Sequence, residues 1–144
     1  MPIGYKRRQR LASGGARSLR PPIIGAGVEY LEPLDAARIA VDAASDRQAD
    51  DILLLNVGEV AAFADFLLIM SAGSPRQMGA LADEIELAMK RGGCALHHRE
   101  GSVESGWVLL DFSDVVVHVF SEEQRAYYRL EEVWSAGKPV VRIQ

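Results

Sequence analysis

The chain has 144 residues, of which 49% are apolar and 25% are charged. This length and composition are typical of one globular domain with a buried core, and no apolar run reaches the roughly 18–20 residues of a membrane helix. The single cysteine, Cys94, excludes an intrachain disulfide and a multi-cysteine zinc site. We expect a buried, reduced thiol there, in a cytoplasmic protein.

The charges are distributed unevenly along the chain. Residues 1–30 contain six Lys or Arg and one Glu, whereas residues 31–144 contain ten Lys or Arg and nineteen Asp or Glu. Residues 1–32 have too little apolar content to fold alone and lack the apolar stretch of a secretory signal. They are predicted to be a disordered extension or the product of a translation start assigned too far upstream. The alternative is a basic arm that contacts RNA or an acidic partner. The acidic remainder favours a basic protein surface over nucleic acid.

The folded domain is predicted over residues 33–135 and begins with a helix. Pro33 suits the first helical position, and apolar residues then recur at helical spacing: Leu34, Ala37, Val41 and Ala44. Residues 51–57 and 65–71 are short runs with apolar residues on both faces. They predict two central strands with helices on both sides.

The second helix has the clearest local signals in the chain. Ser74 is a cap residue, Pro75 suits the first helical position, and Gln77 completes a capping box. One apolar stripe follows: Met78, Leu81, Ala82, Ile85, Ala88 and Met89. The basic pair at 90–91 suits the carboxyl end of the helix, and two glycines at 92–93 end it.

Three further strands are predicted over residues 94–100, 107–112 and 115–120. A two-residue turn at 113–114 would join the last two strands into a hairpin that pairs Trp107 with Phe120, Leu109 with His118 and Asp111 with Val116. One face of the hairpin is then wholly apolar. The other is mixed and carries Trp107, Leu109, Asp111, Val116, His118 and Phe120. We interpret the mixed face as a contact surface.

A capping box at 121–124 starts a last helix that runs through Tyr127, Tyr128, Leu130 and Val133, and residues 136–144 are expected to be a loose tail. The element order is therefore α-β-β-α-β-β-β-α. It predicts an α+β (α/β) domain with a mixed sheet of about five strands and helices packed on it.

Two kinds of function fit this chain, and one of them is a nucleotide-binding enzyme. Residues 71–76 join a strand to a helix start that could hold a phosphate, and Asp111 with Asp114 could hold Mg²⁺. However, two carboxylates on one face of a strand must be two residues apart, so Asp114 is expected to cap the turn instead. No lysine of the P-loop type follows the glycine.

Histidine chemistry is also disfavoured. His97 and His98 are neighbours and point to opposite faces of a strand, and no Gly-x-Ser-x-Gly motif occurs. We therefore expect no catalytic residue, no metal and no cofactor. The other kind of function is protein docking, because an aromatic anchor with a few charged groups, such as Trp107 with Asp111 and His118, is typical of an interface. A Trp that only closes the edge of the core is the alternative.

Three segments together resemble one family. They are "ADFLLIMSAGSPRQMGALADEIE" (64–86), "GWVLLDFSDVVVHVF" (106–120) and "RAYYRLEEVW" (125–134). In order and spacing they resemble the ribosomal silencing factor (RsfS, or Iojap) family. The resemblance implies a nucleotidyltransferase-like fold without transferase chemistry. It also implies binding to ribosomal protein L14 of the large (50S) subunit, a steric block to the small subunit, translational repression when nutrients are scarce, and a homodimer.

The motif residues of the resemblance are divided into two groups by the faces on which they are expected to lie. Trp107, Asp111 and His118, with Tyr128 and Arg76, are expected to bind the partner. A second group is expected to build the motif: Ser74, Gln77, Asp114, Leu130 and Glu131. A pairing of Arg76 with either aspartate of the hairpin is left open. The chain departs from the family pattern at Ser113, where Gly is usual, at Arg129 and in residues 58–66. Contact of the basic arm over residues 1–32 with ribosomal RNA is a further hypothesis.

Overall fold

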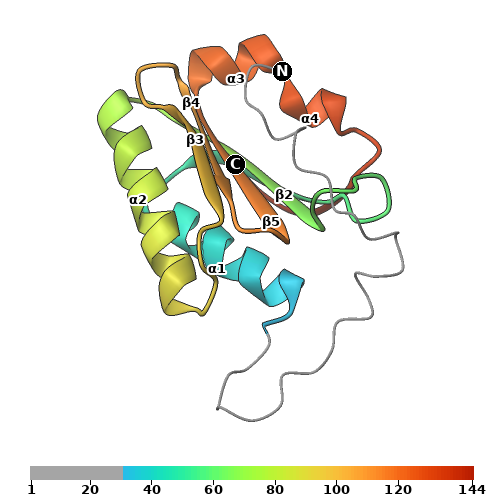
Figure 1. Cartoon of the computed structure of the whole chain (residues 1–144). Coiled ribbons are helices and arrows are strands. Elements are labelled where there is room, and N and C mark those ends of the chain that lie inside the picture. Colours follow the sequence, from blue (N-terminus) through green and yellow to red (C-terminus); the bar gives the residue numbers. More distant parts are fainter. Residues whose placement is uncertain (1–30) are drawn as a thin grey trace.

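The computed structural model describes residues 31–144, so nearly all of the predicted extension over residues 1–32 lies outside the described residues. The described chain forms one mixed sheet with helices packed on it (Figure 1). Its elements are α1 (Pro33–Asp46), β1 (Asp50–Asn56), β2 (Phe66–Ala72), α2 (Pro75–Arg91), β3 (His98–Ser102), β4 (Trp107–Asp111), β5 (Val115–Ser121), α3 (Glu122–Tyr128), α4 (Leu130–Val133) and β6 (Lys138–Ile143). This confirms the predicted fold class and element order, to which α4 and β6 are added.

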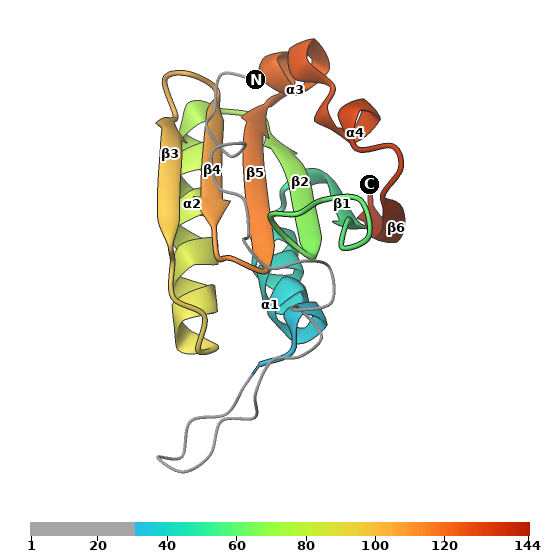
Figure 2. The ribbon, with the colours of Figure 1, turned by 45° about the vertical axis from the view of Figure 1, so that its right-hand side comes forward.

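The six strands lie in the order β3-β4-β5-β2-β1-β6 (Figure 2). β2 and β5 are parallel, with Phe66 beside Val115 and Ala72 beside Ser121, and all other neighbours are antiparallel. The carboxyl ends of β2 and β5 therefore lie at the same end of the sheet. Each leads directly into a helix there, β2 into α2 and β5 into α3.

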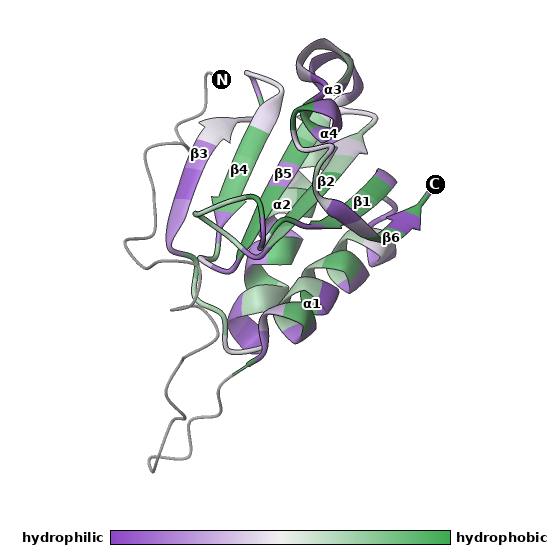
Figure 3. Ribbon diagram, turned by 90° about the vertical axis from the view of Figure 1, so that its right-hand side faces the viewer, coloured by the Kyte–Doolittle hydropathy of each residue, from purple (hydrophilic) through white to green (hydrophobic). Residues whose placement is uncertain are grey.

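Helices cover the two faces of the sheet unequally. α1 and α2, of 14 and 17 residues, lie side by side on one face and bury an apolar cluster that includes Leu54, Leu68 and Val117 (Figure 2). Within residues 31–144, the other face carries only α3 and α4, of seven and four residues, together with residues 57–65. The middle strands are hydrophobic, whereas the edge strand β3 is mostly hydrophilic (Figure 3). Both faces bury an apolar cluster, but smaller elements cover the face with α3 and α4, which makes it the candidate contact surface.

Two boundaries in the C-terminal part of the chain differ from the prediction. Residues 136–144 were expected to be a loose tail, but β6 pairs with β1 along most of its length, with Ile143 beside Ile52 and Pro139 beside Leu55. Proline and lysine in this segment obscure the strand pattern, yet both are usual in an edge strand. The last helix is not continuous either, because Arg129 adopts a left-handed conformation (φ 47°) between α3 and α4.

The third strand is shorter than predicted, because β3 begins at His98 and residues 94–97 precede it without regular structure. Cys94 lies in this connection and is partly exposed, so the expected full burial of the thiol is wrong. Partial burial still raises the pKa of the Cys94 thiol. None of the helices of the described residues is long and apolar enough to cross a bilayer.

Candidate functional site

The hairpin of β4 and β5 has the predicted register. Trp107 pairs with Phe120, Leu109 with His118, and Asp111 with Val116. The Phe112 N–H donates to the Val115 carbonyl at 2.9 Å, which closes the two-residue turn. The predicted mixed face therefore forms, and it lies on the side of the sheet opposite α1 and α2.

Both aspartates of the hairpin take part in the turn. Asp111 Oδ1 accepts the N–H of Ser113 at 2.8 Å, so the carboxylate of Asp111 caps the turn, while the cap expected from the Asp114 side chain stays a prediction. The Asp114 carbonyl accepts the N–H groups of Asp65 and Phe66 at 2.9 and 3.0 Å, which ties the turn to the start of β2. Ser113 has a φ of 74°, the region where glycine is favoured.

Four rings form an aromatic cluster on this face, consisting of Trp107, His118, Phe120 and Tyr128. The Trp107 ring lies 4.7 Å from Phe120, 4.6 Å from Tyr128 and 5.7 Å from His118, measured between ring centroids. α3 brings Tyr128 to the cluster, because it begins at the end of β5, where Phe120 lies. One tyrosine from a helix and three rings from a hairpin thus meet at one end of the sheet.

A hydrogen bond fixes the protonation of His118. The Trp107 Nε1–H donates to His118 Nδ1 at 3.0 Å. Since the indole N–H is only a donor, Nδ1 must be unprotonated and the imidazole neutral. Complete burial lowers the pKa of His118 to about 3, which agrees with a neutral ring.

The five residues predicted to bind the partner differ in exposure and location. Trp107, Asp111 and His118 expose 2, 4 and 0% of their surface. Tyr128 is partly exposed and Arg76 is exposed. Trp107, His118 and Tyr128 lie together in the aromatic cluster, whereas Asp111 is at the far end of β4.

Arg76 does not pair with either hairpin aspartate. It is in the first turn of α2, just beyond the end of β2. Ser71, near the carboxyl end of β2, lies beside Phe120 of β5. Asp111 lies beside Val116, near the other end of β5 and therefore at the opposite end of the sheet. This ion pair is therefore excluded by the register of the strands.

The residues predicted to build the motif have clear structural contacts. Ser74 Oγ accepts the N–H of Gln77 at 3.1 Å, as predicted. The Gln77 side chain accepts the Gly73 N–H at 2.7 Å and donates to the Gln48 carbonyl at 2.9 Å, so it also links α2 to the α1–β1 connection. Leu130 is fully buried, and Glu131 accepts a bond from Arg125.

The nucleotide-binding alternative does not gain a site from this geometry. A cavity of about 230 Å³ adjoins residues 72–75, and its lining includes Glu122 and Glu123. Carboxylates at this position repel a phosphate. Asp111, which this alternative would use, lies at the opposite edge of the sheet.

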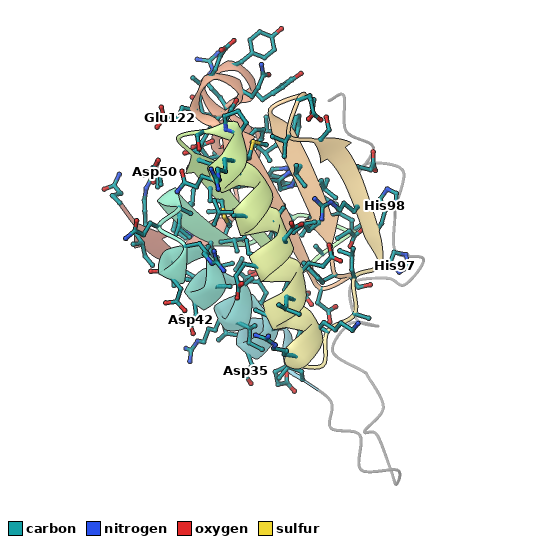
Figure 4. All side chains as sticks on the ribbon, turned by 90° about the vertical axis from the view of Figure 1, so that its left-hand side faces the viewer. Asp35, Asp42, Asp50, His97, His98 and Glu122 are labelled. Atoms are coloured by element: carbon teal, nitrogen blue, oxygen red, sulfur yellow. The ribbon has the colours of Figure 1, made fainter. Side chains whose placement is uncertain are left out.

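The remaining titratable groups do not gather into a metal centre. His97 and His98 lie at the β3 side of the sheet, away from Glu122, and Asp35 and Asp42 lie on α1 (Figure 4). His98 Nε2 contacts Glu100 Oε2 at 2.8 Å. Within residues 31–144, no three His, Cys, Asp or Glu residues are grouped as metal ligands.

One buried group was missed at the sequence level. Arg125 in α3 exposes only 7% of its surface and bonds to β1, β2 and α4. Its one signal in the sequence is its spacing, since it precedes Tyr128 by three residues and therefore shares a side of the helix.

Comparison with known proteins gives a consistent result. The family model described as "Ribosomal silencing factor during starvation" (RsfS) matches residues 31–144. A ribosomal silencing factor RsfS from Halalkalibacterium halodurans is 37% identical over 107 residues, which cover 74% of this chain and 91% of the relative. The corresponding factor from Bacillus subtilis is 41% identical over 97 residues, covering 67% and 82%.

Solved structures are similar in fold. A crystal structure of a protein from Chromobacterium violaceum has a TM-score of 0.71 and 30% identity, covering 79% of this chain and 95% of the other. A Bacillus halodurans crystal structure has a TM-score of 0.66 and 35% identity, covering 75% and 98%. As predicted, the matched family is one of silencing factors and not one of enzymes.

Proposed function

This chain belongs to the RsfS family of ribosomal silencing factors, and from that premise we propose that it binds ribosomal protein L14 on the large subunit. In this position it blocks joining of the small subunit and so represses translation under nutrient limitation. The observation that carries the proposal is the family match over residues 31–144. The factor acts in the cytoplasm, where it meets free subunits.

The docking surface that we propose is the sheet face with the aromatic cluster. Two short helices lie on this face, compared with two long ones on the other. Aromatic side chains beside a few polar groups are the composition of a binding hot spot. The acidic character of residues 31–144 supports a basic protein partner, because opposite charge accelerates encounter and selects the partner.

Within this surface the five predicted residues have different tasks. The partly exposed Tyr128 supplies direct contact, and Trp107 with His118 forms the base on which its ring rests. Asp111 sets the shape of the hairpin turn at the other end of the face. Arg76 is a separate contact at the edge of the sheet where α2 begins.

Co-sedimentation with purified large subunits tests this proposal. Tyr128→Ala and Arg76→Glu are compared with Arg91→Glu, a matched control at the other end of α2, where the arginine is also exposed. We expect Tyr128→Ala to weaken binding by about tenfold, the usual scale of a hot-spot truncation, and Arg91→Glu to bind like the wild type. Absence of wild-type binding, or unchanged binding of both test variants in folded form, would refute the proposal.

We further propose that the basic residues 1–32 contact ribosomal RNA beside the docking site. Phosphate contacts release counterions, so each contact steepens the salt dependence of binding. Deletion of residues 1–32 should weaken large-subunit binding and flatten its dependence on salt concentration. Equal affinity and equal salt dependence of the full and shortened chains would disprove the RNA contact.

A homodimer is the last part of the proposal, and it rests on the resemblance alone. Sedimentation equilibrium of the free protein over a range of concentrations tests it. A mass of one chain at every concentration contradicts the dimer without affecting the ribosome proposal.

A further inference from the structure

The start of β1 has an irregular backbone, and two of its carbonyl groups bind a side chain of α3. The register with β2 shifts between Asp50 and Leu53, and Asp51 has a φ of 44°. Such a bulge disrupts the local ladder, and a carbonyl that loses its ladder partner needs another donor. Arg125 Nη1 donates to the carbonyl oxygens of both Asp50 and Asp51.

The same guanidinium joins further elements. It donates from Nη1 to Ser71 Oγ at 3.3 Å and from Nε to Glu131 Oε2 at 3.1 Å, which adds β2 and α4 to its contacts. Arg125 Nη2 also lies 3.4 Å from Asp51 Oδ2. A charge buried to this extent is stable only with such partners, so the guanidinium is held in one place.

The bond to Glu131 spans the break between the two short helices. Arg129, in its left-handed conformation, donates its N–H to the Arg125 carbonyl at 3.0 Å and ends α3. The Arg125 side chain then reaches past this residue to Glu131 in α4. The main chain and the side chain of one arginine thus both connect α3 to the segment that follows it, and α3 packs beside the ends of β5 and β2 (Figure 3).

Tyr128 follows Arg125 by three residues and lies on Trp107, while Leu130 begins α4 in the core below. We propose that Arg125 is a positioning residue for the docking surface, which places Tyr128 on Trp107 by anchoring α3 and α4 to the bulge of β1. The inference rests on the proposed function in one respect, the expected loss of affinity for large subunits. The expected change in the aromatic cluster can be measured on the free protein and does not depend on ribosome binding.

The test uses two variants of the full chain, Arg125→Gln and Arg125→Lys. Arg129→Gln is the matched control, because Arg129 lies four residues away and its side chain is 67% exposed, with one 3.9 Å contact to Glu132. All are made with Trp134→Phe, so that Trp107 is the sole tryptophan. The readouts are Trp107 emission, its quenching by acrylamide, and affinity for large subunits.

We expect Arg125→Gln to shift Trp107 emission to the red and increase its quenching at temperatures where the protein is folded, because Tyr128 leaves the indole. Affinity for large subunits should fall by about tenfold, the usual scale for loss of a positioned anchor. Arg125→Lys keeps the charge but not the planar guanidinium. Its Trp107 emission, quenching and affinity should therefore lie between those of Arg125→Gln and the wild type. The Arg129 control should match the wild type.

Two results would overturn the inference. If Arg125→Gln lowers only the unfolding temperature while emission and quenching of the folded protein stay unchanged, the role is merely structural. If emission shifts but affinity remains that of the wild type, Arg125 does not shape the docking surface. Should Arg125→Gln not fold, the same readouts on Arg125→Lys decide. Failure of the wild type to bind large subunits refutes the proposed function instead, and the emission data still test the placement of Tyr128.

Discussion

His118 and Trp107 illustrate how single residues combine apolar packing with one specific polar contact. The imidazole is fully buried and accepts the indole N–H of Trp107, so the neutral form is part of the folded structure. Burial lowers the pKa of His118 from 6.5 to about 3. The unfolded chain therefore binds a proton on this residue at a higher pH than the folded chain does, and acid favours unfolding.

The first prediction concerns this pH dependence. As the pH falls from about 6 to about 4, the unfolded chain takes up a proton on His118 and the folded chain does not. The free energy of unfolding should therefore decrease by up to about 1.4 kcal/mol per pH unit, and this decrease is absent above the pKa of the unfolded chain. The measurement is urea unfolding of the wild type and His118→Gln at several pH values. The variant should show a shallower loss on acidification, since its side chain does not titrate. Equal slopes for the two proteins would contradict a buried neutral histidine.

The second prediction compares two glycines with positive φ, Gly106 (79°) and Gly93 (93°). A Cβ at Gly106 would lie 2.6 Å from Gln124 Cγ and 2.8 Å from Ser121 Oγ, whereas none of the neighbours of Gly93 lies within 4 Å. Gly93→Ala should cost about 1–2 kcal/mol from backbone strain alone. Gly106→Ala should cost about 1–3 kcal/mol more from overpacking. Chemical denaturation measures both, and equal costs would show that α3 does not pack tightly on Gly106.

Residue-level inference from the sequence succeeded where periodicity decides the result. Strand parity placed Trp107 and His118 on one face, and the register confirmed it. Parity could not show how deeply a side chain is buried, because burial depends on elements distant in sequence. Arg125 was missed for the same reason: its partners in β1 and β2 are 54 to 75 residues away.

At the scale of elements, β6 extends the sheet beyond β1. β1 consists largely of leucine and isoleucine, and β6 pairs with its outer side. Lys138 and Pro139 at the start of β6 suit an edge strand, because they discourage pairing with a further chain. β6 therefore separates the outer side of this apolar strand from solvent.

The third prediction follows from this pairing. A chain that ends at residue 136 should lose at least about 2 kcal/mol of unfolding free energy, since several ladder hydrogen bonds of about 1 kcal/mol each are removed. It should also aggregate faster, because the edge of β1 becomes exposed. Urea unfolding and light scattering measure the two effects. If the shortened chain is as stable and as soluble as the full chain, the pairing of β6 with β1 does not stabilise the protein and the prediction is wrong.

Elements were predicted best where capping residues and apolar spacing agree. α2 has both, and its cap at Ser74 and its buried stripe were confirmed. β6 was missed because a strand of six residues with proline has a weak pattern. The break at Arg129 was missed because arginine rarely adopts a positive φ, so its sequence gives no stop signal.

At the scale of the whole molecule, the sheet divides the protein into two unlike sides. Two long helices close one side, and two short helices with an aromatic cluster lie on the other. The fold class and element order followed from local patterns, and the family followed from three motifs in order. The burial of the second face did not, since it depends on how α3, α4 and residues 57–65 pack on it. The proposed docking surface is the side that carries the two short helices.

Subunit joining in vitro tests the central claim most directly. Purified large subunits are saturated with the chain, small subunits are added, and formation of complete ribosomes is followed by light scattering. We predict that joining falls in proportion to the fraction of large subunits that carry the chain, and that Tyr128→Ala requires a higher concentration for the same effect. Complete joining at saturating concentrations of the bound wild-type chain would contradict the account.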